Sequence, residues 1–222
     1  MTLRARPPVL REEVTRAVEE QIAAIEARRG VQIVCAVYRR SDTYPEAPWR
    51  AFAAGAVMSA GASLVLDLWR PAWVDATTLL FHLATVLGAA GACAVVVLLC
   101  SRCARSLVPQ ARRDLEVSRR AKELFVTRAL FATESRRAIL VFTSLFERKV
   151  EIIADRAFEH RVNAAGWSAV IAAMAPRLRE ASCGEALLHG LATLDRVLEA
   201  QGFAAQGPIV DEIPNALIQA ES

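Results

Sequence analysis

The chain has 222 residues, of which 54% are apolar, more than one soluble domain of ordinary composition carries. Its 27 Lys and Arg residues nearly balance 24 Asp and Glu residues, so a net charge of +3 argues against a basic nucleic-acid-binding surface. The cysteines are odd in number and scattered, so we expect no disulfide framework and a reducing compartment; they are Cys35, Cys93, Cys100, Cys103 and Cys183.

The first flank of the chain is predicted to open an α/β domain. We expect residues 1–10 to be a flexible N-terminus that lacks the apolar segment of a cleavable signal peptide, and residues 11–46 to be the first part of the domain. Apolar side chains recur at helical spacing over 14–25, and the segment ARRG at 27–30 is typical of a helix C-terminus. The run VQIVCAV at 31–37 then predicts a buried strand.

Two long apolar blocks follow, near residues 51–68 and 77–100, and we interpret them as a transmembrane helical hairpin within residues 47–105. The first block would rise about 27 Å as a helix, close to the hydrocarbon thickness of a bilayer. The second contains His82 as its ionisable side chain, apart from two thiols. The alternative, a pair of buried core helices, does not suit so small a domain.

Tryptophans and small residues also favour a membrane hairpin. Trp49, Trp69 and Trp73 flank the blocks, where indole rings settle between headgroups and hydrocarbon. Small side chains in both blocks would let the helices approach closely, although each also suits a plain lipid-facing position. These residues are Ala53, Ala54, Gly55, Ser59, Ala60 and Gly61 in the first block and Gly88, Ala89, Ala90, Gly91 and Ala92 in the second.

The distribution of arginine predicts the orientation of the hairpin. The short connecting segment carries Arg70 between Asp67 and Asp75, whereas several arginines flank the blocks on the outer sides. By the positive-inside rule, we expect an integral protein of the plasma (inner) membrane with both chain termini in the cytoplasm. The flanking arginines are Arg39, Arg40, Arg50, Arg102, Arg105, Arg112 and Arg113.

The second flank, residues 106–204, is predicted to complete the α/β domain. A helix over 117–125 precedes two strands, AILVFTSL and KVEIIAD, which should pair as an antiparallel hairpin with a charged, solvated tip FER. Asn163 is a candidate helix cap, and Ser182 with Glu185 matches a capping box. We expect residues 205–222 to be a loop-like tail.

Neither flank has enough strands to be stable alone, because one strand precedes the apolar hairpin and two follow it. The two flanks must therefore assemble into one sheet. An even number of membrane crossings returns both flanks to the same side and allows this assembly. We therefore predict an α/β domain that is split by an inserted transmembrane hairpin.

Three segments of the flanks resemble the membrane-embedded branch of the TPM domain family. They are EQIAAIEARRGVQIVCAVYRRSDTYPEAPWRA at 20–51, RRAKELFVTRALFATESRRAILVFTSLFERKVEIIADRAF at 119–158, and DEIPN at 211–215. The resemblance implies a small mixed sheet sandwiched by helices, divalent-cation binding as in some members, and weak acid phosphatase activity as in some plastid members. Unlike those members, this chain has no glycine-rich and acid-rich loops near the first strand.

The sequence contains no recognisable catalytic motif. It has no GxxxxGK[ST], GxGxxG, HExxH or GxSxG pattern, and its three histidines lie in unrelated segments. Cys100 and Cys103 form a CxxC pair at the end of the second block. Because no second pair or nearby histidine accompanies them, we interpret them as unrelated cysteines of an apolar helix end rather than as a metal or redox site.

Carboxylates are the remaining candidates for chemistry. Loop and strand-end oxygens that converge could hold Ca²⁺ or Mg²⁺, and the candidate ligands are Asp155, Asp42, Asp211 and Glu212, with Glu46 and Asn215 beside them. The alternative is that Asp155 caps the following helix and that the other residues are solvated.

Two functions follow from these features. The favoured one is a membrane-anchored TPM-like protein whose partners are the lipid bilayer and another membrane protein, which it binds or regulates without catalysis. The alternative is a divalent-cation-dependent phosphatase or related hydrolase in which the carboxylates hold the cation.

Overall fold

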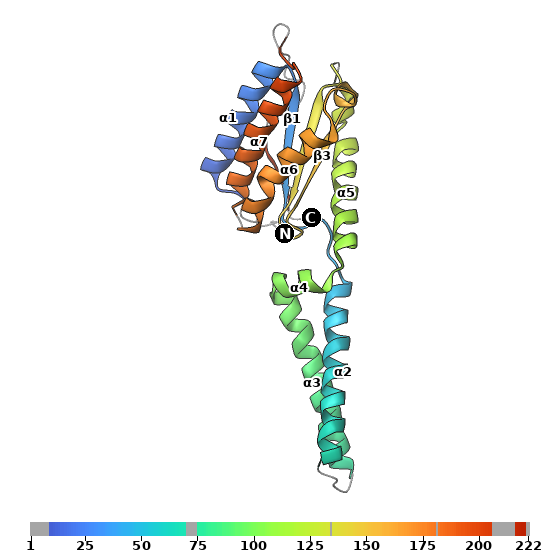
Figure 1. Cartoon of the computed structure of the whole chain (residues 1–222). Coiled ribbons are helices and arrows are strands. Elements are labelled where there is room, and N and C mark those ends of the chain that lie inside the picture. The colour runs from blue at the N-terminus through green and yellow to red at the C-terminus, as the bar shows by residue number, and fades with distance from the viewer. Residues whose placement is uncertain (1–8, 70–74, 134, 181, 206–215, 221–222) are drawn as a thin grey trace. The chain divides into compact units, whose positions relative to one another are not determined.

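A computed structural model describes residues 9–69, 75–133, 135–180, 182–205 and 216–220 of the chain (Figure 1). The chain divides into two compact units. We call the first the sheet unit, which comprises Met1–Asp42 and Arg113–Ser222, and the second the hairpin unit, which comprises Thr43–Arg112. The sheet unit is therefore assembled from both flanks of the chain, and this is the division that the strand count predicted.

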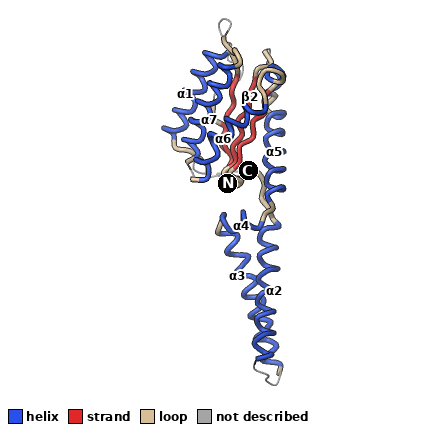
Figure 2. Tube along the Cα trace, viewed as in Figure 1, coloured by secondary structure: helices blue, strands red, loops and turns tan. Residues whose placement is uncertain are grey.

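The sheet unit contains a mixed sheet of four strands in the order β3-β2-β1-β4. The strands are drawn in red in Figure 2. Strand β1 (Gln32–Tyr38) pairs in parallel with β2 (Ala138–Ser144), and β2 pairs antiparallel with β3 (Lys149–Ala154). All seven residues of β1 are buried, as are all seven of β2. The strand that precedes the hairpin thus lies at the centre of a sheet whose other strands follow the hairpin.

The predicted loop-like tail was wrong for its last described part. Residues Ile218–Ala220 form strand β4, which pairs in parallel with Ala36–Tyr38 of β1. The side chain of Gln219 accepts a hydrogen bond from the backbone N–H of Leu10 and donates one to Thr15. A three-residue strand is a weak pattern in a sequence, and its hydrogen-bond partners are more than 180 residues away along the chain.

Helices cover both faces of the sheet, so the predicted sandwich of a mixed sheet between helices is confirmed. Helices α1 (Glu12–Arg29), α6 (Ala164–Arg179) and α7 (Cys183–Ala200) lie on one face, and α5 (Gln110–Thr127) lies on the other (Figure 1). Short 3₁₀ helices η1 (Leu130–Ala132) and η2 (Arg156–Phe158) follow α5 and β3.

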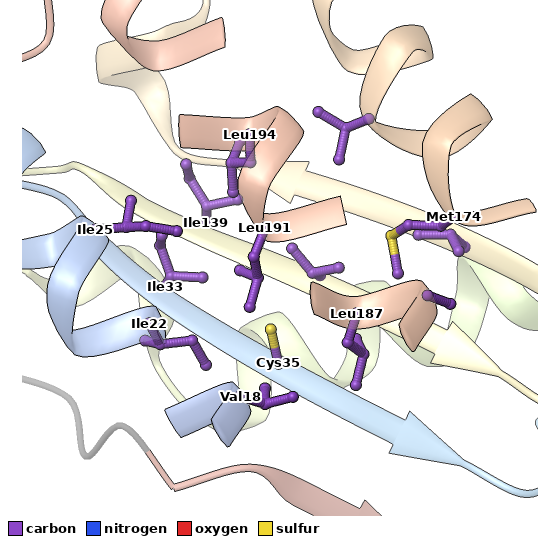
Figure 3. Close-up of a cluster of buried hydrophobic side chains, with 14 of the residues drawn as sticks. Val18, Ile22, Ile25, Ile33, Cys35, Ile139, Met174, Leu187, Leu191 and Leu194 are labelled. Atoms are coloured by element: carbon purple, nitrogen blue, oxygen red, sulfur yellow. The ribbon is translucent and has the colours of Figure 1, made fainter. Parts of the chain in front are cut away.

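The larger of two hydrophobic clusters lies between the sheet and α1, α6 and α7 (Figure 3). Alternate residues of β1 point to opposite faces, so Ile33 and Cys35 enter this cluster whereas Val34 enters the smaller cluster under α5. Residues from both flanks fill each cluster. The side chains that Figure 3 labels in the larger cluster are Val18, Ile22, Ile25, Ile33, Cys35, Ile139, Met174, Leu187, Leu191 and Leu194.

The helix ends follow the local sequence, with one exception. Helix α1 ends at Arg29, and Gly30 adopts a left-handed conformation with φ 65° while its N–H bonds the carbonyl of Glu26. Asn163 caps α6 by accepting a hydrogen bond from Gly166 N–H at 2.9 Å. The predicted capping box was wrong, because Ser182 precedes α7 without a side-chain hydrogen bond to any described cap group.

The turn between β2 and β3 differs from the predicted solvated tip. Glu147 is buried, and its carboxylate accepts hydrogen bonds from the Ser144 hydroxyl and from Ser41 N–H, the latter at 3.1 Å. Phe146 is buried under the guanidinium of Arg40, 4.2 Å from the ring centroid. This turn therefore contacts the loop that follows β1. It provides a second contact, besides the pairing of β1 with β2, between the two flanks of the chain.

The hairpin unit consists of helices α2 (Glu46–Trp69), α3 (Ala76–Leu99) and α4 (Ser101–Leu107). Helices α2 and α3 are long and apolar enough to cross a membrane, and only 11% of the most apolar window of each is buried. Burial in a protein core therefore does not account for their composition. Asp75 caps α3 by accepting a hydrogen bond from Thr78 N–H at 2.8 Å.

The predicted close approach of the two apolar helices occurs at one glycine. A Cβ atom on Gly55 would lie 2.9 Å from Cys93 Sγ and 3.1 Å from the backbone of Ala89 and Ala90. In contrast, a Cβ on Gly61, Gly88 or Gly91 would meet no described atom within 4 Å. Only part of the small-residue pattern is thus used for packing between α2 and α3.

Candidate functional site

The candidate site is built around Asp155, which directly follows the edge strand β3. Its backbone N–H donates to the carbonyl of Ala138 at 2.9 Å, which extends the ladder between β2 and β3 by one residue. Its side-chain Oδ1 accepts a hydrogen bond from Arg156 N–H at 2.8 Å, and its carbonyl accepts one from Phe158 N–H. Asp155 therefore caps η2, as the second interpretation of this residue from the sequence expected, with Arg156 N–H as the donor to its side chain.

The second carboxylate oxygen of Asp155 has unused hydrogen-bonding capacity. The side chain is 6% exposed, and Oδ2 accepts no hydrogen bond from any described residue. Its closest cationic neighbour is Arg136, whose Nη1 lies 3.7 Å away on a half-exposed side chain. A buried carboxylate oxygen that accepts no hydrogen bond favours the binding of a ligand that supplies a hydrogen-bond donor or a cation.

Asp155 lines a cleft of about 440 Å³ along the edge of the sheet. Most lining residues are apolar, although polar atoms provide more of the exposed lining than apolar atoms do, and Phe158 meets Trp167 edge to face at a ring-centroid distance of 6.0 Å. The charged residues Asp155, Arg156 and Glu159 also line the cleft. The remaining lining residues are Phe125, Ile152, Ala154 and Val162. The cleft thus combines an apolar surface with a few charged groups, as is common in ligand and peptide sites.

The backbone of β3 is open toward this cleft. Antiparallel pairing alternates, so the backbone groups of successive residues point toward and away from the neighbouring strand. Because Asp155 N–H bonds β2, the amide and carbonyl groups of Ile152 and Ala154 point away from β2, on the side of the strand where the sheet ends. An extended peptide could pair with such an edge.

Asp42 does not join Asp155, because the two residues lie at opposite ends of the sheet. Asp42 follows β1, whose last residue Tyr38 pairs with Ser144, whereas Asp155 follows Ala154, which pairs with Ile139 near the start of β2. Roughly 20 Å of strand separates these two ends. The predicted cation site depended on both residues lying at one end of the sheet, which would require β3 to run parallel to β1.

Asp42 instead lines a separate depression of about 300 Å³. Arg119 and Arg120 share this depression with the carboxylates, so its donor set does not resemble a site for a hard cation. The other lining residues are Ser41, Glu116 and Glu123. The strand directions of the sheet therefore keep Asp42 apart from Asp155.

The remaining predicted ligands do not assemble with Asp155 in the part of the chain that the structure describes. Asp211, Glu212 and Asn215 lie outside the described residues. Glu46 lies in the hairpin unit, where its carboxylate pairs with Arg112 Nε at 2.8 Å. Among described residues, no group of three or more His, Cys, Asp or Glu side chains is arranged to hold a metal ion.

Two buried glutamates were missed by sequence reasoning. Glu26 lies in the last turns of α1, is 5% exposed, and accepts a hydrogen bond from Ile33 N–H at the start of β1. Glu147 has the corresponding structural role in the turn between β2 and β3. No local pattern marks either residue, because a glutamate in a helix end or a turn is usually solvated.

Residues 94–197 match the family model described as the TPM domain. The match covers slightly less than half of the chain, so it shows similarity to the TPM domain family over this region. The matched region includes α5, β2, β3, α6 and most of α7, whereas β1 lies before it. The sheet that contains the matched region therefore takes one of its central strands, β1, from the segment that precedes the hairpin.

A solved structure supports the fold. The NMR structure of BA42 protein from the psychrophilic bacterium Bizionia argentinensis superposes with a TM-score of 0.56, covering 98% of this chain and 99% of that chain. The two sequences are 12% identical, so the similarity shows the fold alone. No curated protein matches the chain.

Proposed function

We propose that this chain is a membrane-anchored, TPM-like protein that binds or regulates another membrane protein without catalysis. The observation that carries the proposal is the exposed apolar surface of α2 and α3. Large side chains on both helices are more than half exposed, including Met58 and Leu66 on α2 and Phe81 and Leu98 on α3. Lipid is the environment that removes such a surface from water without a protein core.

The dimensions and ends of these helices support insertion into a bilayer. Each has 24 residues and rises about 36 Å, enough to cross the hydrocarbon region. Trp49 and Trp69 lie near the two ends of α2 with highly exposed rings, which suits the two interfaces of a membrane.

The arginine pattern supports an inner-membrane protein with both termini in the cytoplasm. Arginines precede α2 and follow α3, whereas the connecting segment carries Arg70 between two aspartates. A membrane-impermeant maleimide tests this orientation in a background whose native cysteines are replaced by serine. In intact cells, it should label Ala72→Cys but label Ala204→Cys only after the membrane is permeabilised. The reverse pattern would overturn the orientation, and labelling of both sites would overturn the two-span topology.

The open edge of β3 supports a binding role. Among the described strands, none pairs with the outer side of β3, and a cleft of mixed polarity lies beside it, a combination that suits an extended segment of a partner protein. Among the described residues, no group of three or more His, Cys, Asp or Glu side chains is arranged to hold the metal ion that metal-assisted catalysis needs. These features favour recognition over catalysis.

A site-specific crosslinker tests the binding role in living cells. Placed at the exposed position Arg156 in the cleft, it should give a discrete adduct whose second component is an integral membrane protein. The matched control is Glu199, which is 65% exposed on α7, and it should give no such adduct. Absence of the adduct at 156, or the same adduct at both positions, would contradict binding at this edge.

A divalent-cation-dependent phosphatase is the second candidate function, and the buried Oδ2 of Asp155 is the observation that favours it. Trp167 lines the same cleft and provides a reporter. Titration of the detergent-solubilised protein with Ca²⁺ or Mg²⁺ should change Trp167 fluorescence and raise the melting temperature if a cation binds there. No response to either ion would remove this candidate.

A further inference from the structure

Cys100 and Cys103 face each other at the corner between α3 and α4. Cys100 is the residue that separates the two helices, and its backbone is extended, with φ −108° and ψ 98°. Cys103 lies in the first turn of α4, and its thiol donates a hydrogen bond to Cys100 Sγ across 3.0 Å. The sequence alone suggested two unrelated cysteines, and the structure instead brings the two sulfur atoms together.

We propose that Cys100 and Cys103 form a thiol–disulfide exchange site that reacts with low-molecular-weight disulfides of the glutathione class and closes to an intrachain disulfide. This inference is independent of the proposed binding role. It assigns a reversible covalent modification to the hairpin unit, at the end of its second apolar helix.

The geometry requires little movement for the disulfide to form. The sulfur atoms need to approach by roughly 1 Å to reach the disulfide bond length of about 2.05 Å. Cys100 has an extended backbone between α3 and α4, and its N–H and carbonyl remain bonded to Val96 and Ala104 in the flanking helices, so side-chain rotation at the two cysteines supplies this approach. Both side chains are partly exposed, so a small disulfide can reach them.

The hydrogen bond between the two thiols also decides which of them attacks. It lowers the pKa of the Cys100 thiol, with further contributions from the Cys103 backbone and from Arg102, and it raises the pKa of the Cys103 thiol. Cys100 is therefore the better nucleophile at neutral pH, because the thiolate is the reactive form. Cys103 is placed to resolve the product.

The exchange proceeds in two balanced steps. The Cys100 thiolate attacks one sulfur of the small disulfide, the disulfide bond breaks, and one thiolate leaves and takes up a proton from solvent. Cys103 then loses its proton and attacks Cys100 Sγ, which releases the second small thiol. Two protein thiols are oxidised, one small disulfide is reduced to two thiols, and no other oxidant is needed.

The other cysteines do not share this arrangement. Cys35 and Cys183 are buried, and burial raises the pKa of each thiol to about 12, so both are poor nucleophiles. Cys93 is exposed on α3, but no thiol contact to it is described. A metal site at Cys100 and Cys103 is also not formed, because no third side chain of suitable type joins them among the described residues.

Mass spectrometry of the full chain in detergent micelles tests the inference. After incubation with glutathione disulfide and alkylation of the remaining thiols, two of the five cysteines should be protected from alkylation together. Trypsin cleaves after Arg102, so a Cys100–Cys103 disulfide should join two otherwise separate peptides, and a reductant should release them. Full alkylation of both cysteines after this treatment would overturn the proposal.

Two single variants separate the roles of the two thiols. Cys103→Ser should retain glutathione on Cys100 as a stable mixed disulfide, because the resolving thiol is missing, whereas the wild type should not. Cys100→Ser should take up glutathione much more slowly at position 103. Equal retention of glutathione on Cys100 in the wild type and in Cys103→Ser would contradict the resolving step, and equal uptake by both variants would contradict the assignment of the nucleophile.

Discussion

Replacing Val34 with Asp should destabilise the whole sheet unit, although Val34 belongs to the flank before the hairpin. Val34 is 3% exposed in β1, it pairs with Leu140 of β2, and it packs in the cluster beneath α5. The substitution removes a buried valine side chain and places an unpartnered carboxyl group in its position. Together these changes cost about 3–6 kcal/mol, a large part of the 5–15 kcal/mol typical of a domain.

Two measurements on the full chain in detergent report this loss. The neighbouring thiol of Cys35 is 1% exposed, so its alkylation requires opening of the sheet and should accelerate by roughly 10²–10⁴-fold in the variant. Amide exchange in β2 should accelerate with it. Ala24→Asp, which adds the same charge at an exposed position of α1, is the control and should leave both rates nearly unchanged. A protease-resistant core over residues 111–222 that persists in Val34→Asp would refute the split-domain assembly.

Three further predictions concern other contacts. Gly55→Leu should weaken packing of α2 on α3 by about 1–3 kcal/mol and lower the melting temperature in detergent. Gly61→Leu is the control and should not lower it, because a side chain at position 61 meets no described neighbour. Equal effects of the two variants would exclude the contact at Gly55. Burial raises the pKa of the Asp195 carboxyl, but hydrogen bonds from Arg29 and Arg28 lower this pKa overall. These hydrogen bonds therefore stabilise the folded state by about 1 kcal/mol above about pH 4, and the stabilisation disappears as the pH falls through the folded-state pKa. In urea titrations at several pH values, Asp195→Asn should therefore be less stable than the wild type at neutral pH and equal to it in acid. Asp155→Asn should cost a few tenths to about 1 kcal/mol equally with and without Ca²⁺ if Asp155 is a helix cap, and a shift that appears only with Ca²⁺ would instead identify a ligand.

Local sequence signals predicted most of the fold because they depend on short-range physics. The glycine that ends α1, the asparagine that caps α6 and the antiparallel pair β2 and β3 all follow from residues within one turn or one hairpin. The apolar blocks are equally local. Strand β4 was missed because its pairing with β1 depends on a partner far away along the chain, while three residues provide almost no periodic pattern.

The candidate site was harder to predict, because its composition depends on strand direction. The pair β2 and β3 was correctly expected to be antiparallel, but the parallel pairing of β1 with β2 has no local signature. That pairing alone decides that Asp155 and Asp42 emerge at opposite ends of the sheet. The buried roles of Glu26 and Glu147 likewise depend on tertiary contacts with β1 and with the loop that leaves it.

The topology explains why this domain tolerates an insertion between β1 and α5. Parallel strands cannot be joined by a tight turn, so β1 and β2 require a long crossover connection whose helix, α5, covers one face of the sheet. The two apolar helices are inserted into this crossover before α5 begins, where no pairing of β1 with β2 has to be broken. Lengthening a connection adds little closure entropy, since the cost rises only with the logarithm of its length. An insertion at this point therefore leaves the pairing of the central strand β1 with β2 intact.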